Sequence, residues 1–163
     1  MTFAYTIALT MLVALANVLA SATPEASPVA NDDCADLPAY FQNLADLTGS
    51  NSGYIAIKSD AATVFDLPAD VSQTISTSLE ELIRQLDSME PPVAAEDYHE
   101  AFVDQVAWYR DLVSAVDFAA YQRIVNRDKQ LVPAMSRAIL AGQAACGVDT
   151  WADAYNDAFG EKP

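Results

Sequence analysis

Few side chains in this sequence could carry out chemistry. The 163 residues include one histidine, His99, and two cysteines, Cys34 and Cys146, whereas Asp and Glu together number 23. His99 follows Glu96 in a Glu-x-x-His spacing, which places two metal ligands on one face of a helix. Dinuclear sites of this kind need the motif on two helices, and the sequence has no second histidine. We therefore expect no metal and no other cofactor.

A mononuclear site formed by His99 with Glu96 or Glu100 is the alternative. Without a metal, His99 should be a surface or boundary residue beside acidic groups, whose charge should favour the imidazolium. No serine lies in a glycine-flanked nucleophile elbow, and no glycine-rich loop for phosphates is present. We therefore expect that the protein is not an enzyme.

Aromatic residues are concentrated in the C-terminal half of the chain, and we interpret most of them as core, with tyrosine hydroxyls reaching the surface. The functional alternative is an apolar cleft between the main helices and a short last helix. The ligand-binding candidates for that cleft are Tyr98, Phe102, Tyr109, Trp151 and Tyr155.

The charge of the chain excludes one class of partner. Eight Lys and Arg stand against 23 Asp and Glu, a net charge of -15, and such a surface repels nucleic acids. Arg123 and Arg127 lie one helical turn apart and could bind an anion, but pairing with Asp128 and with acids of neighbouring helices is the favoured interpretation.

The N-terminus has the pattern of an export signal. Residues 3–20 carry no charge, and small residues at Ala20 and Ala22 suit a signal peptidase, although no Lys or Arg precedes the apolar run. We predict a signal peptide over residues 1–22, with cleavage after Ala22 or, second, after Ala20. The alternative is an uncleaved anchor, because about 18 apolar residues can just span a bilayer. Residues 23–33 are predicted to be a disordered linker.

Two amphipathic helices flank Pro91-Pro92. Apolar residues recur at three- and four-residue steps over 71–89 and again over 98–116, which predicts one apolar face on each helix. Pro92 should end the first helix near this point, and the acidic Glu96 and Asp97 suit the start of the second.

After this break the helical pattern continues too long for one helix. Between Val93 and Ala141 the only breaker is Pro133, and one helix of roughly 50 residues would be about 75 Å long. We place a turn near residues 114–118 with Asp117 as the next N-cap. A turn at residues 126–130 is the alternative. Pro133 should kink the last long helix.

The two ends of residues 34–163, which we take as one domain, are also predicted to be helical. A first helix should run from Asp36, as N-cap, to about Thr48. Residues 54–66 are predicted to pass from loop to helix, with Asp60 capping a short turn through Phe65. A short amphipathic helix should start in a capping box at 150–153 and stop at Gly160.

The cysteines link these elements into a topology. Cys34 precedes the first helix and Cys146 ends the fourth, and in an up-down-up-down four-helix bundle those ends lie at the same pole. We predict a disulfide between them, as is typical of exported proteins. The predicted fold class is all-α: a four-helix bundle closed by one disulfide, with a short C-terminal amphipathic helix.

The predicted function is that of an exported, non-catalytic binding or interaction module of the cell envelope or extracellular space. Its partner would be a protein or a small molecule, not a nucleic acid, and a membrane only if the N-terminal segment is uncleaved. The alternatives are a small-ligand or metal-binding protein, an enzyme that uses carboxylates alone, and a structural envelope component. No motif identifies a protein family.

Overall fold

The computed structural model describes residues 34–60 and 67–160, and the regular secondary structure within these ranges is helical. The predicted signal peptide and linker lie outside the described residues, as does most of the turn expected after Asp60. The helices are α1 (Leu37–Ser50), α2 (Ser52–Asp60), α3 (Ala69–Leu86), the 3-10 helix η3 (Val93–Ala95), α4 (Glu96–Val113), α5 (Phe118–Cys146) and α6 (Val148–Phe159).

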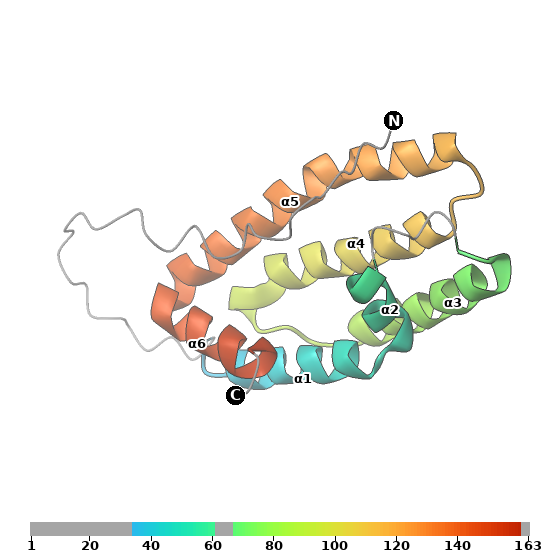
Figure 1. Ribbon diagram of the computed structural model, residues 1–163. Helices are drawn as coiled ribbons and strands as arrows, with labels where there is room; N and C mark the ends of the chain where they lie inside the picture. The colour runs from blue at the N-terminus through green and yellow to red at the C-terminus, as the bar shows by residue number, and fades with distance from the viewer. Residues whose placement is uncertain (1–33, 61–66, 161–163) are drawn as a thin grey trace.

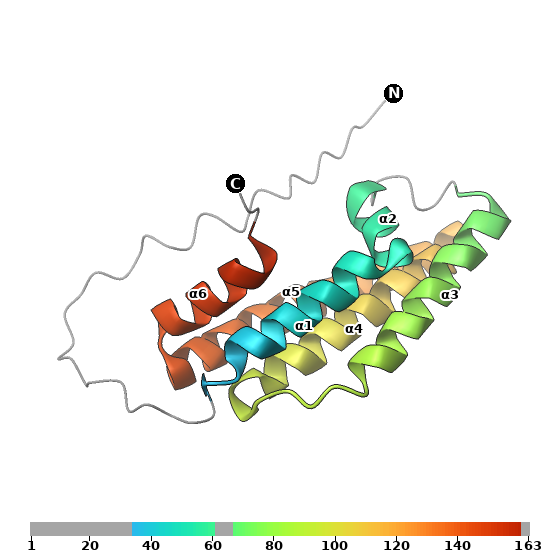
Figure 2. The same ribbon diagram turned by 90° about the horizontal axis from the view of Figure 1, so that it is seen from below.

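The long helices lie side by side. Helix α4 packs between α3 and α5 and runs antiparallel to both (Figure 1). Helix α1 packs mainly against α6 and α2, and α6 also contacts the end of α5. Figure 2 shows α1, α3, α4 and α5 with similar axis directions and α6 turned back beside α1. Within the described residues no single helix is long and apolar enough to cross a membrane, although α5 and α6 together, bent by 118°, meet that criterion by length and composition.

The break at Pro91-Pro92 is confirmed. Helix α3 ends at Leu86, and η3 leads into α4 with Glu96 and Asp97 in its first turn. Both flanking helices have 18 residues, and each ends three residues before the end of its apolar pattern. Val116 lies beyond the end of α4 and is 91% exposed, so its assignment to the apolar face was wrong.

The turn before α5 is also confirmed. Helix α4 ends at Val113, and the Asp117 carboxylate accepts a hydrogen bond from the Ala120 backbone N–H at 2.7 Å. Helix α5 then runs without interruption for 29 residues, so the alternative turn at residues 126–130 is wrong. Pro133 lies inside this continuous helix, and the kink expected there stays a prediction.

The loop-to-helix passage predicted from residue 54 was wrong, because α2 already begins at Ser52. The Asn51 side chain accepts from the Tyr54 N–H at 2.9 Å and donates to the Ser78 carbonyl on α3 at 2.8 Å. A Cβ at Gly53 would lie 2.8 Å from the Ile75 carbonyl oxygen, so glycine permits the close approach of α2 to α3. These contacts hold the corner between α1 and α2 on α3.

One predicted helix cap is confirmed in position only, and another was wrong. Asp36 occupies the N-cap position of α1, but its side chain makes no capping hydrogen bond. Helix α6 begins at Val148, directly after Gly147, so Thr150 lies inside the first turn and forms no capping box. Gly147 has φ +87°, a conformation that favours glycine, and it separates α5 from α6 within one residue. The predicted stop at Gly160 is confirmed.

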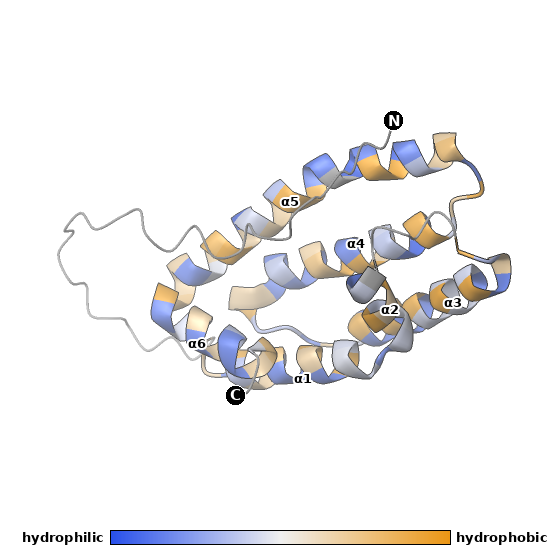
Figure 3. Cartoon of the chain, in the orientation of Figure 1, coloured by the Kyte–Doolittle hydropathy of each residue, from blue (hydrophilic) through white to orange (hydrophobic). Residues whose placement is uncertain are grey.

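The core forms where the apolar faces of these helices meet. Hydrophobic residues recur along each helix between hydrophilic ones (Figure 3). Each large aliphatic side chain that is fully buried stabilises the fold by roughly 1.5–3 kcal/mol. The largest fully buried side chains are Leu37, Phe41, Leu44, Ile57, Leu79, Leu82, Leu86 and Val106.

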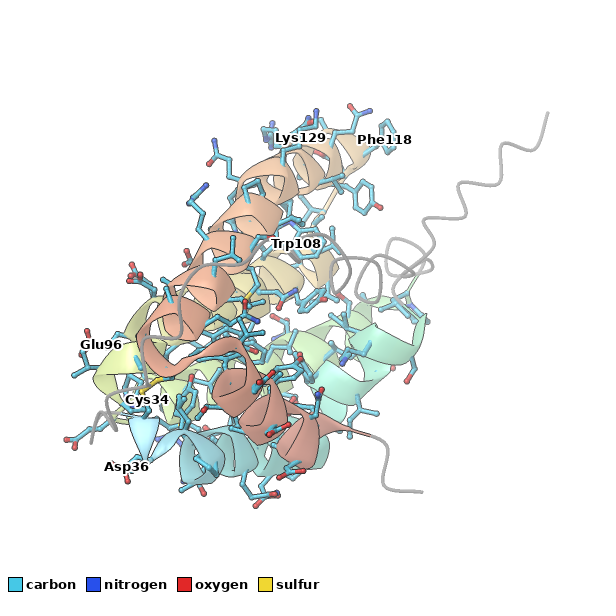
Figure 4. The ribbon with its side chains drawn as sticks, turned by 90° about the vertical axis from the view of Figure 1, so that its left-hand side faces the viewer. Cys34, Asp36, Glu96, Trp108, Phe118 and Lys129 are labelled. Atoms are coloured by element: carbon cyan, nitrogen blue, oxygen red, sulfur yellow. A yellow bond between two sulfur atoms is a disulfide. The ribbon has the colours of Figure 1, made fainter. Side chains whose placement is uncertain are left out.

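The Cys34–Cys146 disulfide is confirmed. The two Cα atoms lie 5.7 Å apart, within the range for such a bond, and the sequence separation is 112. The disulfide joins the residues just before α1 to the last residue of α5 (Figure 4). The α6 helix begins two residues later, so the disulfide also lies next to the corner that directs α6 onto α1.

We predict that Gly142→Ala destabilises the protein. A Cβ at residue 142 would overlap the Trp151 ring, which is 2% exposed and has no room to move. Overpacking of this kind costs about 1–3 kcal/mol, measurable by urea denaturation. Gly49→Ala is the matched control, because an added Cβ there has no neighbour within 4 Å and should leave stability unchanged or raise it. Equal effects of the two substitutions would contradict the close seating of Trp151.

We predict that Cys34→Ser lowers the free energy of unfolding by roughly 2–5 kcal/mol under oxidising conditions. The physical reason is that the bond closes a long loop in the unfolded chain. Under a reducing agent the difference between the wild type and the variant should largely disappear. Two free thiols in oxidised, folded protein would refute the bond.

Candidate functional site

The space between the last helix and the rest of the molecule is filled by aromatic rings. Phe41 of α1, which is fully buried, contacts the rings of Tyr98, Trp151 and Tyr155 at centroid distances of 5.5, 5.1 and 5.5 Å. All three contacts are edge-to-face, the arrangement that aromatic pairs prefer. We call Phe41, Tyr98, Trp151, Tyr155 and Phe159 the aromatic cluster. It attaches α6 to α1 and α4.

The interpretation of the ligand-binding candidates as core is confirmed where they are buried. Tyr98, Phe102 and Trp151 are 5% exposed or less. Tyr109 and Tyr155 are half-buried, and Tyr109 contacts Tyr54 of α2. Phe102 contacts both Tyr54 and Tyr98, and so connects the ring of Tyr54 to the aromatic cluster. Ligand binding by the cluster stays a prediction, and it would require α6 to move away from α1. Phe118, in contrast, is an aromatic residue of the C-terminal half that is exposed and does not belong to the core.

His99 faces a tyrosine. Its Nδ1 lies 3.1 Å from the Tyr40 hydroxyl of α1, and burial lowers the pKa of the imidazole below its usual value. A hydrogen bond with the Leu86 backbone and the charge of Asp87 oppose this shift but are smaller effects. The expectation that neighbouring acids favour the imidazolium was therefore wrong, since burial outweighs them. The neutral ring links α4 to α1 and to the end of α3.

Glu96 is exposed in the first turn of α4. Across residues 34–60 and 67–160 no three His, Cys, Asp or Glu side chains gather in a way that could hold a metal ion. His99 instead makes the hydrogen bond with Tyr40.

An open groove of about 280 Å³ lies between α4 and α5. Asp97, Glu100 and Asp104 line it from α4, at the three- and four-residue steps that share one helix face, and Arg137 lines it from α5. The remaining lining residues are alanines. Three carboxylates around one guanidinium leave an excess of negative charge on this groove.

The basic residues of α5 have different surroundings. Arg127 pairs with Asp111 of α4 at 3.1 Å, which confirms pairing with a neighbouring-helix acid, while the placement of the Asp128 side chain is not described. Arg123 and Lys129 are exposed. Anion binding by Arg123 with Arg127 stays a prediction.

The structure adds a surface that the sequence reasoning missed. Phe118, Val125, Val132 and Leu140 are exposed along α5, at steps of seven and eight residues. They fall within one sector of the helix, and a separate sector with Ile124, Met135, Ala138 and Cys146 packs on the core. We call the exposed set the α5 outer row. In the sequence, the α5 outer row corresponds to a second set of periodically spaced apolar residues. This set is offset around the helix axis from the set that packs on the core.

Comparisons with known proteins identify no relative. No protein-family model matches the chain, and neither a curated protein nor a solved structure matches it.

We predict that protonation of His99 destabilises the fold. Because the folded-state pKa lies below the usual value, the unfolded chain binds the proton more readily, and stability should fall as pH drops below about 6.5. Other acidic groups also titrate, so the quantity to measure is the difference in free energy of unfolding between the wild type and His99→Gln. The wild type should be more stable than the variant by the largest margin near pH 7.5, and this margin should shrink toward pH 5. A constant difference would contradict the role assigned to burial.

Proposed function

We propose that this protein is an extracytoplasmic, non-catalytic interaction module built on an up-down-up-down four-helix bundle of α1, α3, α4 and α5. The antiparallel packing of α4 against α3 and α5 supports this topology. So does the disulfide, which brings the start of α1 to the end of α5. Helix α6 would then be an appended element that covers the aromatic cluster.

The observation that carries the proposal is the α5 outer row. Phe118 is 59% exposed, Val132 61% and Leu140 64%, although α5 already presents a separate apolar face to the core. We take this row of large exposed apolar side chains as the surface that a partner covers. We therefore assign binding to α5.

Two further observations support export and a non-catalytic role. A disulfide of this kind persists in oxidising compartments, in agreement with the predicted signal peptide. Cys34 and Cys146 are bonded to each other, and His99 is hydrogen-bonded with Tyr40, so the side chains best suited to catalysis are used in holding the fold.

A photo-cross-linking amino acid at Val132 tests this function in cells of the native source. We expect a discrete adduct, whose partner is identified by mass spectrometry and should bind the purified protein. The purified protein should begin at Thr23 or Ser21 if the signal peptide is cleaved as predicted. The same amino acid at Val93, which is 64% exposed but lies outside α5, is the control. Absence of an adduct at Val132, or equal adducts at both positions, would refute binding through α5.

A further inference from the structure

We propose that the α5 outer row binds an acidic amphipathic helix of another protein. This inference rests on the proposed function and specifies the partner. The binding surface consists of Phe118, Val125, Val132 and Leu140 together with one exposed basic residue of the same sector, Lys129.

The first argument is charge. Helix α5 carries four of the eight Lys and Arg of the chain and one of its 23 acidic residues. Arg127 pairs with Asp111, and Arg137 lines the groove with the carboxylates of α4, so both are directed to α4. Arg123 lies one turn before Arg127 on the same face of the helix, so Lys129 is the exposed basic residue that shares the sector of the outer row. Figure 4 shows Phe118 and Lys129 on the part of α5 that lies away from α1. A chain with a net charge of -15 thus places the positive charge of Lys129 among the exposed apolar side chains of this helix.

The second argument is geometry. Phe118, Val125 and Val132 are spaced by seven residues, the repeat with which one helix packs along another. From Phe118 to Leu140 the row extends over about 33 Å, given a rise of about 1.5 Å per residue. A partner helix laid along this row would meet apolar side chains at every second turn and Lys129 between Val125 and Val132.

The position of Lys129 argues against a second copy of this chain as the occupant. Lys129 lies midway between Phe118 and Leu140. Two α5 helices paired along the row would bring Lys129 of one copy opposite Lys129 of the other in either a parallel or an antiparallel arrangement. Like charges placed opposite each other are destabilising, and two chains of charge -15 also repel each other. A partner with a carboxylate at this level would instead form an ion pair.

An anionic membrane is also a poorer occupant. The net charge of the chain opposes its approach to anionic lipid. The outer row offers one line of apolar side chains, whereas helices that lie in a membrane interface bury a wide apolar face.

Titration with three synthetic peptides tests the inference. The first is a helix with Leu at seven-residue steps flanked by Glu, the second has Lys in place of Glu, and the third is a scrambled form of the first. We expect saturable binding of the Glu peptide alone. Val132→Ser and Lys129→Glu should each weaken the affinity for the Glu peptide several-fold, by roughly tenfold at most. Lys129→Glu should also improve binding of the Lys peptide. Val93→Ser and Lys58→Glu are matched controls outside α5 and should leave the affinity unchanged.

Several results would overturn the inference. The inference is wrong if the Glu peptide does not bind saturably, if the scrambled peptide binds equally well, or if Lys129→Glu does not change the affinity for the Glu peptide. Sedimentation that shows a dimer lost in Val132→Ser would identify a second copy as the occupant, and binding to phosphatidylglycerol vesicles in preference to the Glu peptide would identify a membrane. A cross-linked partner at Val132 that lacks an acidic helix would leave the proposed function intact and refute only this inference.

Discussion

The packing of α6 onto α1 through Phe41 is the interaction on which the arrangement of the helices depends. Phe41 has no exposed surface, and its ring meets side chains from both α4 and α6. Two glycines make this packing possible. Gly147 allows the chain to turn within one residue, and Gly142 of α5 leaves room for the ring of Trp151 of α6. A larger residue at either position would displace α6 and open the aromatic cluster to water.

The parts of the fold that could be predicted from the sequence are those set by local signals or by a unique pair of residues. Asp117 marks the start of α5 because an N-cap acts on a backbone N–H three residues away. With only two cysteines in the chain, one pairing was possible within it, and the ends of the predicted helices brought the two together. Pro91-Pro92 interrupts the helical pattern whatever surrounds it.

The parts that could not be predicted depend on contacts between distant segments. The start of α2 depends on Asn51 and on its hydrogen bond with Ser78 of α3, which no local pattern indicates. The protonation of His99 depends on burial against α1, whereas its sequence neighbours are acidic. For the candidate surface, Phe118 and Val125 belong to the same run of apolar residues as the core face of α5. The sequence alone does not tell which of the two apolar sectors of α5 is buried. The packing of α4 beside α5 decides this.

The position of the disulfide has a mechanical consequence. A force applied between the segment before Cys34 and the C-terminus would pass directly from Cys34 to Cys146 through the covalent bond. Residues 35–145 lie within the closed loop and would bear none of this tension. Only the residues after Cys146, which include α6, could be extended. Under load the aromatic cluster would therefore open by the detachment of α6, while the long helices kept their packing.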